Sequence, residues 1–523
     1  MRSPALSVAL LLTLAVHAAA YTIPVENHNG TFVRRRWPAS AQPIQFQIND
    51  QTGPQLPNVA PGSDPLGVLA RAMTRWPAVS AIRFQQGPMT QTTDAGCDGE
   101  NIITFANTAA NQMTFEMAGG DAVVGLTIHC FNPDSEDYAE ADVLFNPNLQ
   151  FTTTLNTDAD LAVQNMEDIE ATAAHELGHV TGLHHSGIES ATMWPIVSVL
   201  QRHLDADDIA GARTLYPVTA PSGTVSGTVT VNSQPGFGAQ VVALRSSGQV
   251  AASALTLPDG TYAIESLPPD TYTLYVEPLD GPMAAVPDGT CVLVGNLNGA
   301  GIYRNATLTT NFPTMFLGGN DTPAALVLTA GSTMPANFTL PSGANPINPT
   351  VVGPATVTPG GTSWSVSTRP LGIMVGADQF ITVGGPHVDQ TQEISIDGPG
   401  VTVDSSSVMH QSIMCGGATL PVLIFHATVA ADAAPGGRAI LLRAGAAVST
   451  MTAAVDVLAP PCTGDCNEDG VVTVDELLTM VNIALGNATI AQCQAGDANG
   501  DGHITVDEIL TAVNNALNGC GSR

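Results

Sequence analysis

The first part of the chain alternates short apolar strands with amphipathic helical segments. Residues 44–48, Ile-Gln-Phe-Gln-Ile, alternate apolar and polar side chains, which predicts a half-buried strand. Residues 63–65, Ser-Asp-Pro, form a helix start, and the apolar residues after them recur on one helical face. This order predicts an α+β or α/β domain that ends near Pro217. The other predicted elements are extended segments at 82–85, 101–106, 123–131 and 141–145, and a helix at 168–181.

The pattern changes after Pro217. Helical periodicity disappears for about 240 residues, and short β-rich segments alternate with Gly and Pro turns such as Leu257-Pro-Asp-Gly. This alternation is typical of β-sandwiches. A segment rich in Pro, Asn and Gly near 342–349 divides it into two predicted sandwich domains, 222–341 and 347–459.

The tail, residues 462–523, contains an internal repeat at an offset of 32 residues. Residues 473–486 and 505–518 are identical at ten of fourteen positions, and each copy has a helical apolar pattern. The tail is therefore predicted to be a small all-α module of two loop–helix units.

The first twenty residues have the features of a secretory signal peptide. Arg2 precedes an apolar stretch from Ala5 to Val16, and small residues at 18–20 form a cleavage site. We expect residues 1–20 to be removed and the product to be secreted, or held at the cell surface by a partner; an uncleaved anchor is the alternative. No later stretch is long and apolar enough to predict a membrane span.

Composition narrows the function further. The 523 residues include 46 acidic side chains and 15 basic ones, all Arg, for a net charge of −31. Nucleic-acid binding needs basic surface and is excluded on this ground. Eight cysteines in an exported chain favour disulfides within modules. They cluster as Cys97 with Cys130, Cys291 with Cys415, and four in the tail whose three possible connectivities stay open.

The predicted helix at 168–181 carries the chemistry. His175 and His179 lie four residues apart, so both rings point to one side of the helix and can reach one metal ion, with Glu176 beside its open position. Gly182 permits a left-handed turn, after which His185 can return as third ligand. Three imidazoles on a tetrahedral zinc ion leave one position for water, which is typical of a catalytic site.

Other interpretations of these histidines stay open. A buried helix could satisfy them with core hydrogen bonds, or the site could hold metal without catalysis. His184 is interpreted as an exposed neighbour, because the spacing selects His185.

The motif resembles the zinc signature of metzincin metallopeptidases, in particular the matrixins and their bacterial relatives. Residues 191–195, Ala-Thr-Met-Trp-Pro, resemble the Met-turn of that clan, and 204–216 resemble the closing helix of a matrixin domain. The resemblance spans 33–217, so we assign 21–217 to this domain. It implies an α+β fold with a mixed twisted sheet and three helices.

The resemblance also implies a mechanism. One zinc ion would activate water, Glu176 would act as general base, and Met193 would form an apolar floor. The reaction would be endoproteolysis of extracellular proteins or peptides, bound along an edge strand at 123–131. Residues 195–200 would wall the pocket for the residue after the scissile bond.

One feature of the family is not expected here. Its second, structural zinc uses several His and Asp; His129 lies near one such position, but Leu144 stands where another imidazole is expected. We predict no second zinc and interpret His129 as a strand residue.

The tail repeat has the spacing of two calcium loops. Positions 1, 3, 5, 7 and 12 of each loop supply oxygens, position 7 through its main-chain carbonyl. The pair resembles EF-hand-like dockerin modules, which implies two Ca²⁺ ions and a cohesin-type or surface partner, although dockerins commonly close the loop with Asp. A merely acidic, solvated repeat is the alternative. The predicted ligands are Asp465, Asn467, Asp469, Val471 and Glu476 in the first loop, and Asp497, Asn499, Asp501, His503 and Glu508 in the second.

The two sandwiches carry no catalytic motif. Residues 222–284 resemble the carboxypeptidase regulatory-like domain, and 347–459 are interpreted as Ig-like; spacer or adhesive roles are expected. Two functions therefore remain. The chain is either a secreted zinc metalloendopeptidase with accessory modules, or a surface- or matrix-binding adhesive protein with a catalytically weak peptidase-like domain.

Overall fold

The computed structural model describes most of the chain. Within it, no helix combines the length and apolar character that crossing a bilayer requires. The predicted signal peptide lies outside the described ranges. These are 25–28, 31–53, 55–132, 135, 137–279, 301–303, 306–415, 418–460, 462–466, 471–498 and 501–520.

The N-terminal domain is built on a five-stranded mixed sheet in the order β4-β3-β5-β7-β6. Four strands are parallel, whereas β6 pairs antiparallel with β7 and forms one edge. A mixed sheet was expected. The edge strand β6 was expected at 123–131 and begins at Gly125. The strands are β3 (Ile44–Ile48), β4 (Phe84–Gln86), β5 (Asn101–Thr104), β6 (Gly125–Phe131) and β7 (Tyr138–Phe145).

In the described part of this domain five α-helices accompany the sheet, so the expectation of three was wrong. The two unexpected helices, α2 and α3, are short, and each begins at a threonine that caps it: Thr108 accepts from the Asn111 N–H and Thr157 from the Asp160 N–H. Such capping stabilises helices whose apolar periodicity is too weak to detect. The helices are α1 (Pro65–Val79), α2 (Ala109–Ala118), α3 (Asp158–Gln164), α4 (Ile169–Thr181) and α5 (Ala206–Leu215); two small pairs add β1 (Val25–His28) with β2 (Thr31–Arg34), and β8 (Phe151–Thr152) with β9 (Glu167–Asp168).

Two β-sandwiches follow, as the turn-rich pattern predicted. The first has sheets of β10 (Gly223–Val231), β11 (Gln234–Pro235), β14 (Thr261–Leu267), β18 (Thr333–Pro335) and β19 (Phe338–Leu340), and of β12 (Gln240–Arg245), β13 (Val250–Leu255), β15 (Asp270–Glu277), β16 (Met315–Phe316) and β17 (Ala325–Leu328). The second has sheets of β20 (Val351–Thr358), β21 (Gly361–Trp364), β23 (Asp378–Gly384), β25 (Val401–Cys415) and β26 (Ala418–Val429), and of β22 (Leu371–Met374), β24 (Glu393–Ile396), β27 (Gly436–Ala444) and β28 (Ala447–Leu458).

The tail contains two helices, α6 (Val474–Ala484) and α7 (Val506–Asn518), around a small core that includes Met480 and Ala512. Disulfides join Cys462 to Cys520 and Cys466 to Cys493, which selects one of the three connectivities. Cys97 and Cys130 are paired, as expected. The expected pairing of Cys291 with Cys415 is not described, because Cys291 lies outside the described residues.

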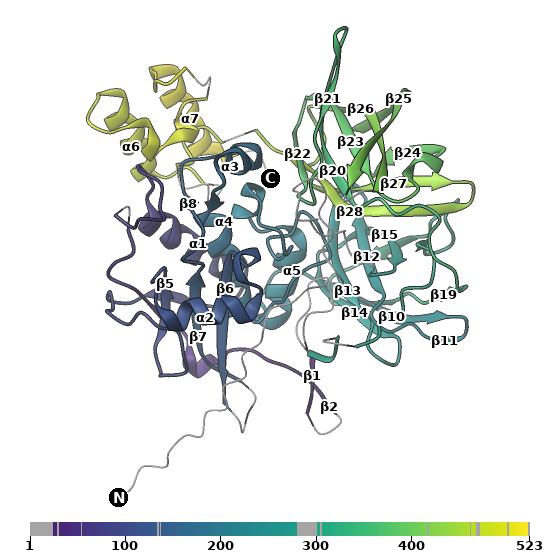
Figure 1. Cartoon of the computed structure of the whole chain (residues 1–523), viewed down its shortest axis with the longest axis horizontal. Coiled ribbons are helices and arrows are strands. Elements are labelled where there is room, and N and C mark those ends of the chain that lie inside the picture. The colour runs from purple at the N-terminus through teal and green to yellow at the C-terminus, as the bar shows by residue number, and fades with distance from the viewer. Residues whose placement is uncertain are drawn as a thin grey trace, which may run out of the picture.

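The N-terminal domain lies between the tail and the two sandwiches (Figure 1). Helix α5 packs on β13 and β14, and one continuous apolar core joins the N-terminal domain to the first sandwich. A second buried cluster takes side chains from the N-terminal domain and from both sandwiches, among them Ile188, Tyr275 and Ala453. The modules therefore meet through apolar contacts, and the segment that includes Ile188 lies at their junction.

Candidate metal centre

Helix α4 is fixed at both ends. The Asp168 carboxylate caps its start by accepting from the Ala171 N–H at 2.7 Å. At its end Gly182 is left-handed, with φ of 102°, and its N–H bonds to the carbonyls of Gly178 and His179. The left-handed turn expected at Gly182 is thus present, and it turns the chain back toward the helix.

The structure brings His175, His179 and His185 together. Their ligating atoms all lie within 4.8 Å of one another. The ring of His185 lies 5.1 Å from that of His175 and 4.9 Å from that of His179, centroid to centroid. The two helical histidines and the returning one therefore form a compact donor set.

Hydrogen bonds orient two of these rings. His175 donates from Nδ1 to the Thr192 carbonyl at 2.7 Å, and His179 from Nδ1 to the Leu183 carbonyl at 2.8 Å. Each Nε2 is thereby left with a lone pair for a metal ion. Burial, helped by His179, lowers the pKa of His175 to about 3, and burial lowers the pKa of His179 to about 4. Neutral imidazoles with Nε2 available fit a zinc ion.

Glu176 lies buried beside this set. Its Oε2 accepts a hydrogen bond from Thr127 Oγ1, on the edge strand β6, at 2.7 Å. Burial raises the pKa of Glu176 to about 8, and the Thr127 hydroxyl opposes this shift. Gly125 gives the carboxylate its room, because a Cβ there would lie 2.6 Å from Glu176 Oε1. A carboxylate placed beside the open position of a metal site can accept a proton and pass it on.

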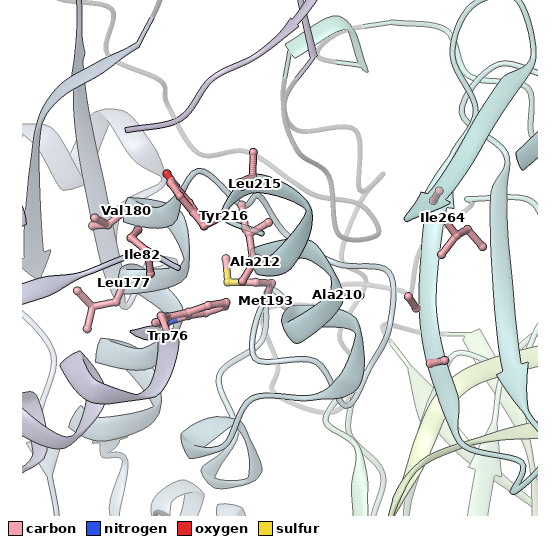
Figure 2. Close-up of a cluster of buried hydrophobic side chains, with 14 of the residues drawn as sticks. Trp76, Ile82, Leu177, Val180, Met193, Ala210, Ala212, Leu215, Tyr216 and Ile264 are labelled. Atoms are coloured by element: carbon pink, nitrogen blue, oxygen red, sulfur yellow. The ribbon is translucent and has the colours of Figure 1, made fainter. Parts of the chain in front are cut away.

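The loop of residues 186–203, called the Met193 loop below, supports the site from beneath. Met193 is fully buried, and Figure 2 shows it between Trp76 and Leu177 on one side and the alanines of α5 on the other. The Asp208 carboxylate holds the turn by accepting from the N–H groups of Thr192 at 2.7 Å and of Met193 at 3.1 Å. The supporting roles of Thr127, Thr192 and Asp208 were missed, since none is part of a recognisable spacing.

The two neighbouring histidines stand apart from the donor set. His129 lies on β6, stacks on Tyr138 and bonds through Nε2 to the His179 carbonyl at 2.9 Å. Burial, with the nearby His179, lowers its pKa to about 3. His184 is half-buried, with its ring 5.7 Å from that of His179. His129 thus supports the end of α4 from the sheet.

The calcium loops are described in part, since Asn467, Asp469 and Asn499 lie outside the described residues. The last carboxylate of each loop turns inward. Glu476 accepts from the N–H groups of Cys466 at 2.9 Å and Thr473 at 2.7 Å, and Glu508 does the same with Ala498 and Thr505. In the second loop, Asp497 accepts from the Asp501 and Gly502 N–H groups at 3.0 and 2.8 Å. In both loops, carboxylates therefore accept hydrogen bonds from backbone N–H groups of the same loop.

Comparison with known proteins supports two of the modules. The matrixin family model matches residues 36–217, and the carboxypeptidase regulatory-like domain model matches 224–286. Metalloendoproteinase 2-MMP of Arabidopsis thaliana is 27% identical over 226 residues, which are 42% of this chain and 54% of that protein.

Two other relatives match shorter stretches. The hatching enzyme of Paracentrotus lividus is 31% identical over 162 residues, 31% of this chain and 24% of that protein. Karilysin of Tannerella forsythia is 43% identical over 49 residues, 9% and 10% of the two chains. The chain spans about half the length of the first of these three relatives, and less of the other two.

Replacing His185 tests the donor set. We expect His185→Ala to weaken zinc binding by more than about 100-fold, because losing only an outer partner of a ligand already costs about 10- to 100-fold. Metal content after dialysis against graded zinc concentrations measures this. His184→Ala, the adjacent residue, is the matched control and should keep full occupancy; equal occupancy in both variants would remove His185 from the site.

A methyl group at Gly125 tests the placement of Glu176. The added Cβ would lie 2.6 Å from Glu176 Oε1 and 2.8 Å from Thr172 Cγ2, so the carboxylate must move. We expect Gly125→Ala to lower kcat/KM about tenfold or more with zinc content unchanged. Gly96→Ala, which has open space around its Cβ, serves as control. Unchanged peptide hydrolysis in Gly125→Ala would show that the carboxylate position is not critical.

Proposed function

We propose that this chain is a secreted, zinc-dependent endopeptidase that hydrolyses peptide bonds of extracellular proteins. The observation that carries the proposal is the compact set of three histidines with the buried Glu176 carboxylate beside it. The matrixin match over residues 36–217 supports a metalloendopeptidase.

Each side chain has a defined role in this proposal. His175, His179 and His185 would hold the ion, which when bound would lower the pKa of a water molecule and polarise the scissile carbonyl. Glu176 would take the proton of the attacking water and transfer it to the leaving amine. The Thr127 hydroxyl, bonded to Oε2, fixes the direction of the carboxylate. Met193 would close the site from below as an apolar floor.

The sheet edge offers a place for the substrate. Among the described strands β6 pairs only with β7, on one side, so its other side can accept an extended peptide as an added strand. Main-chain bonds would set the direction of the peptide, and its scissile bond would pass Glu176, which contacts the same strand through Thr127. Residues 195–200 would wall the pocket for the next side chain.

The tail is proposed to bind two Ca²⁺ ions and a surface or cohesin-type partner. The inward carboxylates of Glu476, Asp497 and Glu508 support calcium binding. Equivalent apolar side chains are exposed in both repeats, at Val474 and Leu478 on α6 and at the matching positions of α7, which supports a partner. Secretion rests on the predicted signal peptide at 1–20.

Replacing Glu176 separates an enzyme from an adhesive protein. We expect Glu176→Ala to keep zinc but lose about 100- to 10,000-fold in kcat, because the residue moves a proton and does not hold the ion. Cleavage of a peptide library, with and without a zinc chelator, measures this. Glu116→Ala, an exposed carboxylate on α2, is the control and should cleave normally. A parent protein that holds zinc but cleaves nothing would favour the adhesive alternative.

Calcium should order the tail. We expect the amides of α6 and α7 to exchange hydrogen at least about tenfold more slowly with calcium, because a small core and clustered carboxylates leave the calcium-free fold marginal. Hydrogen exchange of the full chain, with zinc held constant, measures this. Asp465→Ala should reduce the exchange protection of α6 more than that of α7. Asp475 is exposed, and Asp475→Ala should change the protection of either helix little. Equal exchange with and without calcium would contradict calcium binding.

A further inference from the structure

We propose that Arg369, in the second sandwich, is a positioning residue of the active site. It would hold the outer part of the Met193 loop and so set the selectivity for the residue after the scissile bond. The proposal rests on the proposed endopeptidase function, and it gives the second sandwich a role beyond spacing or adhesion.

The inner side of the Met193 loop is fixed by the N-terminal domain. The Thr192 carbonyl accepts from His175, and Gln201 Nε2 donates to the carbonyls of Ala191 at 3.1 Å and Trp194 at 3.3 Å. The Asp158 carboxylate, at the start of α3, accepts from Ser198 Oγ at 2.6 Å and from the Val199 N–H at 2.9 Å. The stretch 194–197 lies between the residues bonded to His175 and those bonded to Asp158, and there the loop meets the two sandwiches.

The first sandwich supplies apolar support for that stretch. Trp194 directly follows Met193 and is 2% exposed. Its side chain packs in a cluster with Leu255, Leu279 and Tyr303 of the first sandwich, and Ile196 packs against the same cluster. The residue after the metal-site methionine is therefore inserted into a neighbouring module.

The second sandwich supplies the polar support. Trp194 Nε1 donates to the Thr368 carbonyl at 2.9 Å, and Arg369 Nε donates to the Val197 carbonyl at 2.6 Å. A charged donor makes the second bond a strong one. Strand β22 approaches the far end of the loop, since a Cβ on Gly372 would lie 3.3 Å from Leu200 Cδ2. The segment 368–372 thus follows the loop from Trp194 to Leu200.

Arg369 is also placed electrostatically. Burial raises the pKa of Glu167, on the strand before α4, and the Arg369 guanidinium opposes this rise. The arginine that donates to the Val197 carbonyl is therefore also near enough to attract this carboxylate of the N-terminal domain.

This arrangement predicts a specific defect. Without Arg369 the Val197 carbonyl loses its donor, and the loop can shift while α4, His185 and the Asp208 contacts stay in place. A shifted pocket wall changes how tightly one substrate side chain fits, with a smaller effect on the reaction itself. The defect should therefore appear mainly in KM and in the preference between substrates.

The test uses the full chain and two peptides that differ only in the residue after the scissile bond, Leu or Ala. We expect Arg369→Ala to change the Leu-to-Ala ratio of kcat/KM about three- to tenfold, chiefly through KM, with zinc content unchanged. Arg369→Lys, which keeps a cationic donor, should recover part of the ratio. Arg443→Ala removes a similar arginine–carbonyl contact between the two sandwiches, with Asn320, and should leave the ratio unchanged.

A ratio equal to that of the parent in Arg369→Ala would overturn the proposal, as would an equal change in Arg443→Ala. Arg369→Met, which keeps an aliphatic stem but removes the donors to the Val197 carbonyl, provides the same test if Arg369→Ala does not fold, and an unchanged ratio there would also overturn the proposal. A parent protein that cleaves neither peptide refutes the proposed function itself, which is a separate outcome.

Discussion

The candidate site depends on one geometric constraint. Two histidines one helical turn apart can offer only two rings to the same point, so a third must come from chain that has left the helix and returned. Gly182 provides the reversal with its left-handed backbone. The hydrogen bond from His175 to the Thr192 carbonyl then joins α4 to the returning loop. The positions of His185 and Met193 both follow from this closure.

Buried carboxylates hold the closed loop through hydrogen bonds from backbone N–H and hydroxyl groups. Asp208 accepts the N–H groups of Thr192 and Met193, and Ser186 donates its hydroxyl to Asp207 at 2.7 Å. Burial, together with Asp205 and Asp207, raises the pKa of Asp208 well above its ordinary value. The backbone donors that would be costly to bury unpaired are thereby satisfied. A chain with few basic residues thus uses carboxylate–amide bonds at the start of α5 to fix its loop.

The same loop is where the modules meet. Asp207 also accepts from the Ser253 N–H of the first sandwich at 2.8 Å, and the Glu189 N–H donates to the Thr452 carbonyl of the second at 3.0 Å. Together with the shared cluster around Ile188, these bonds make the sandwiches part of the surroundings of the metal site. The tail has a lighter contact, in which Asn156 donates to Gln494 at 3.0 Å.

The sequence by itself determined the features that depend on local spacing. Alternation predicted β3, a helix-start signal predicted α1, a helical pattern predicted α4, and the interval from His175 to His185 predicted which histidines meet. The helices α2 and α3 were missed because they are short and bury few apolar side chains, Phe115 and Ala118 on α2 and Leu161 on α3. Only the tertiary structure decided the partners of those residues: Thr127 for Glu176, Asp208 for the Met193 turn, and Arg369 for the loop wall. Each is a contact between separate segments of the chain. The spacing of residues within one segment does not show which other segment it will pack against.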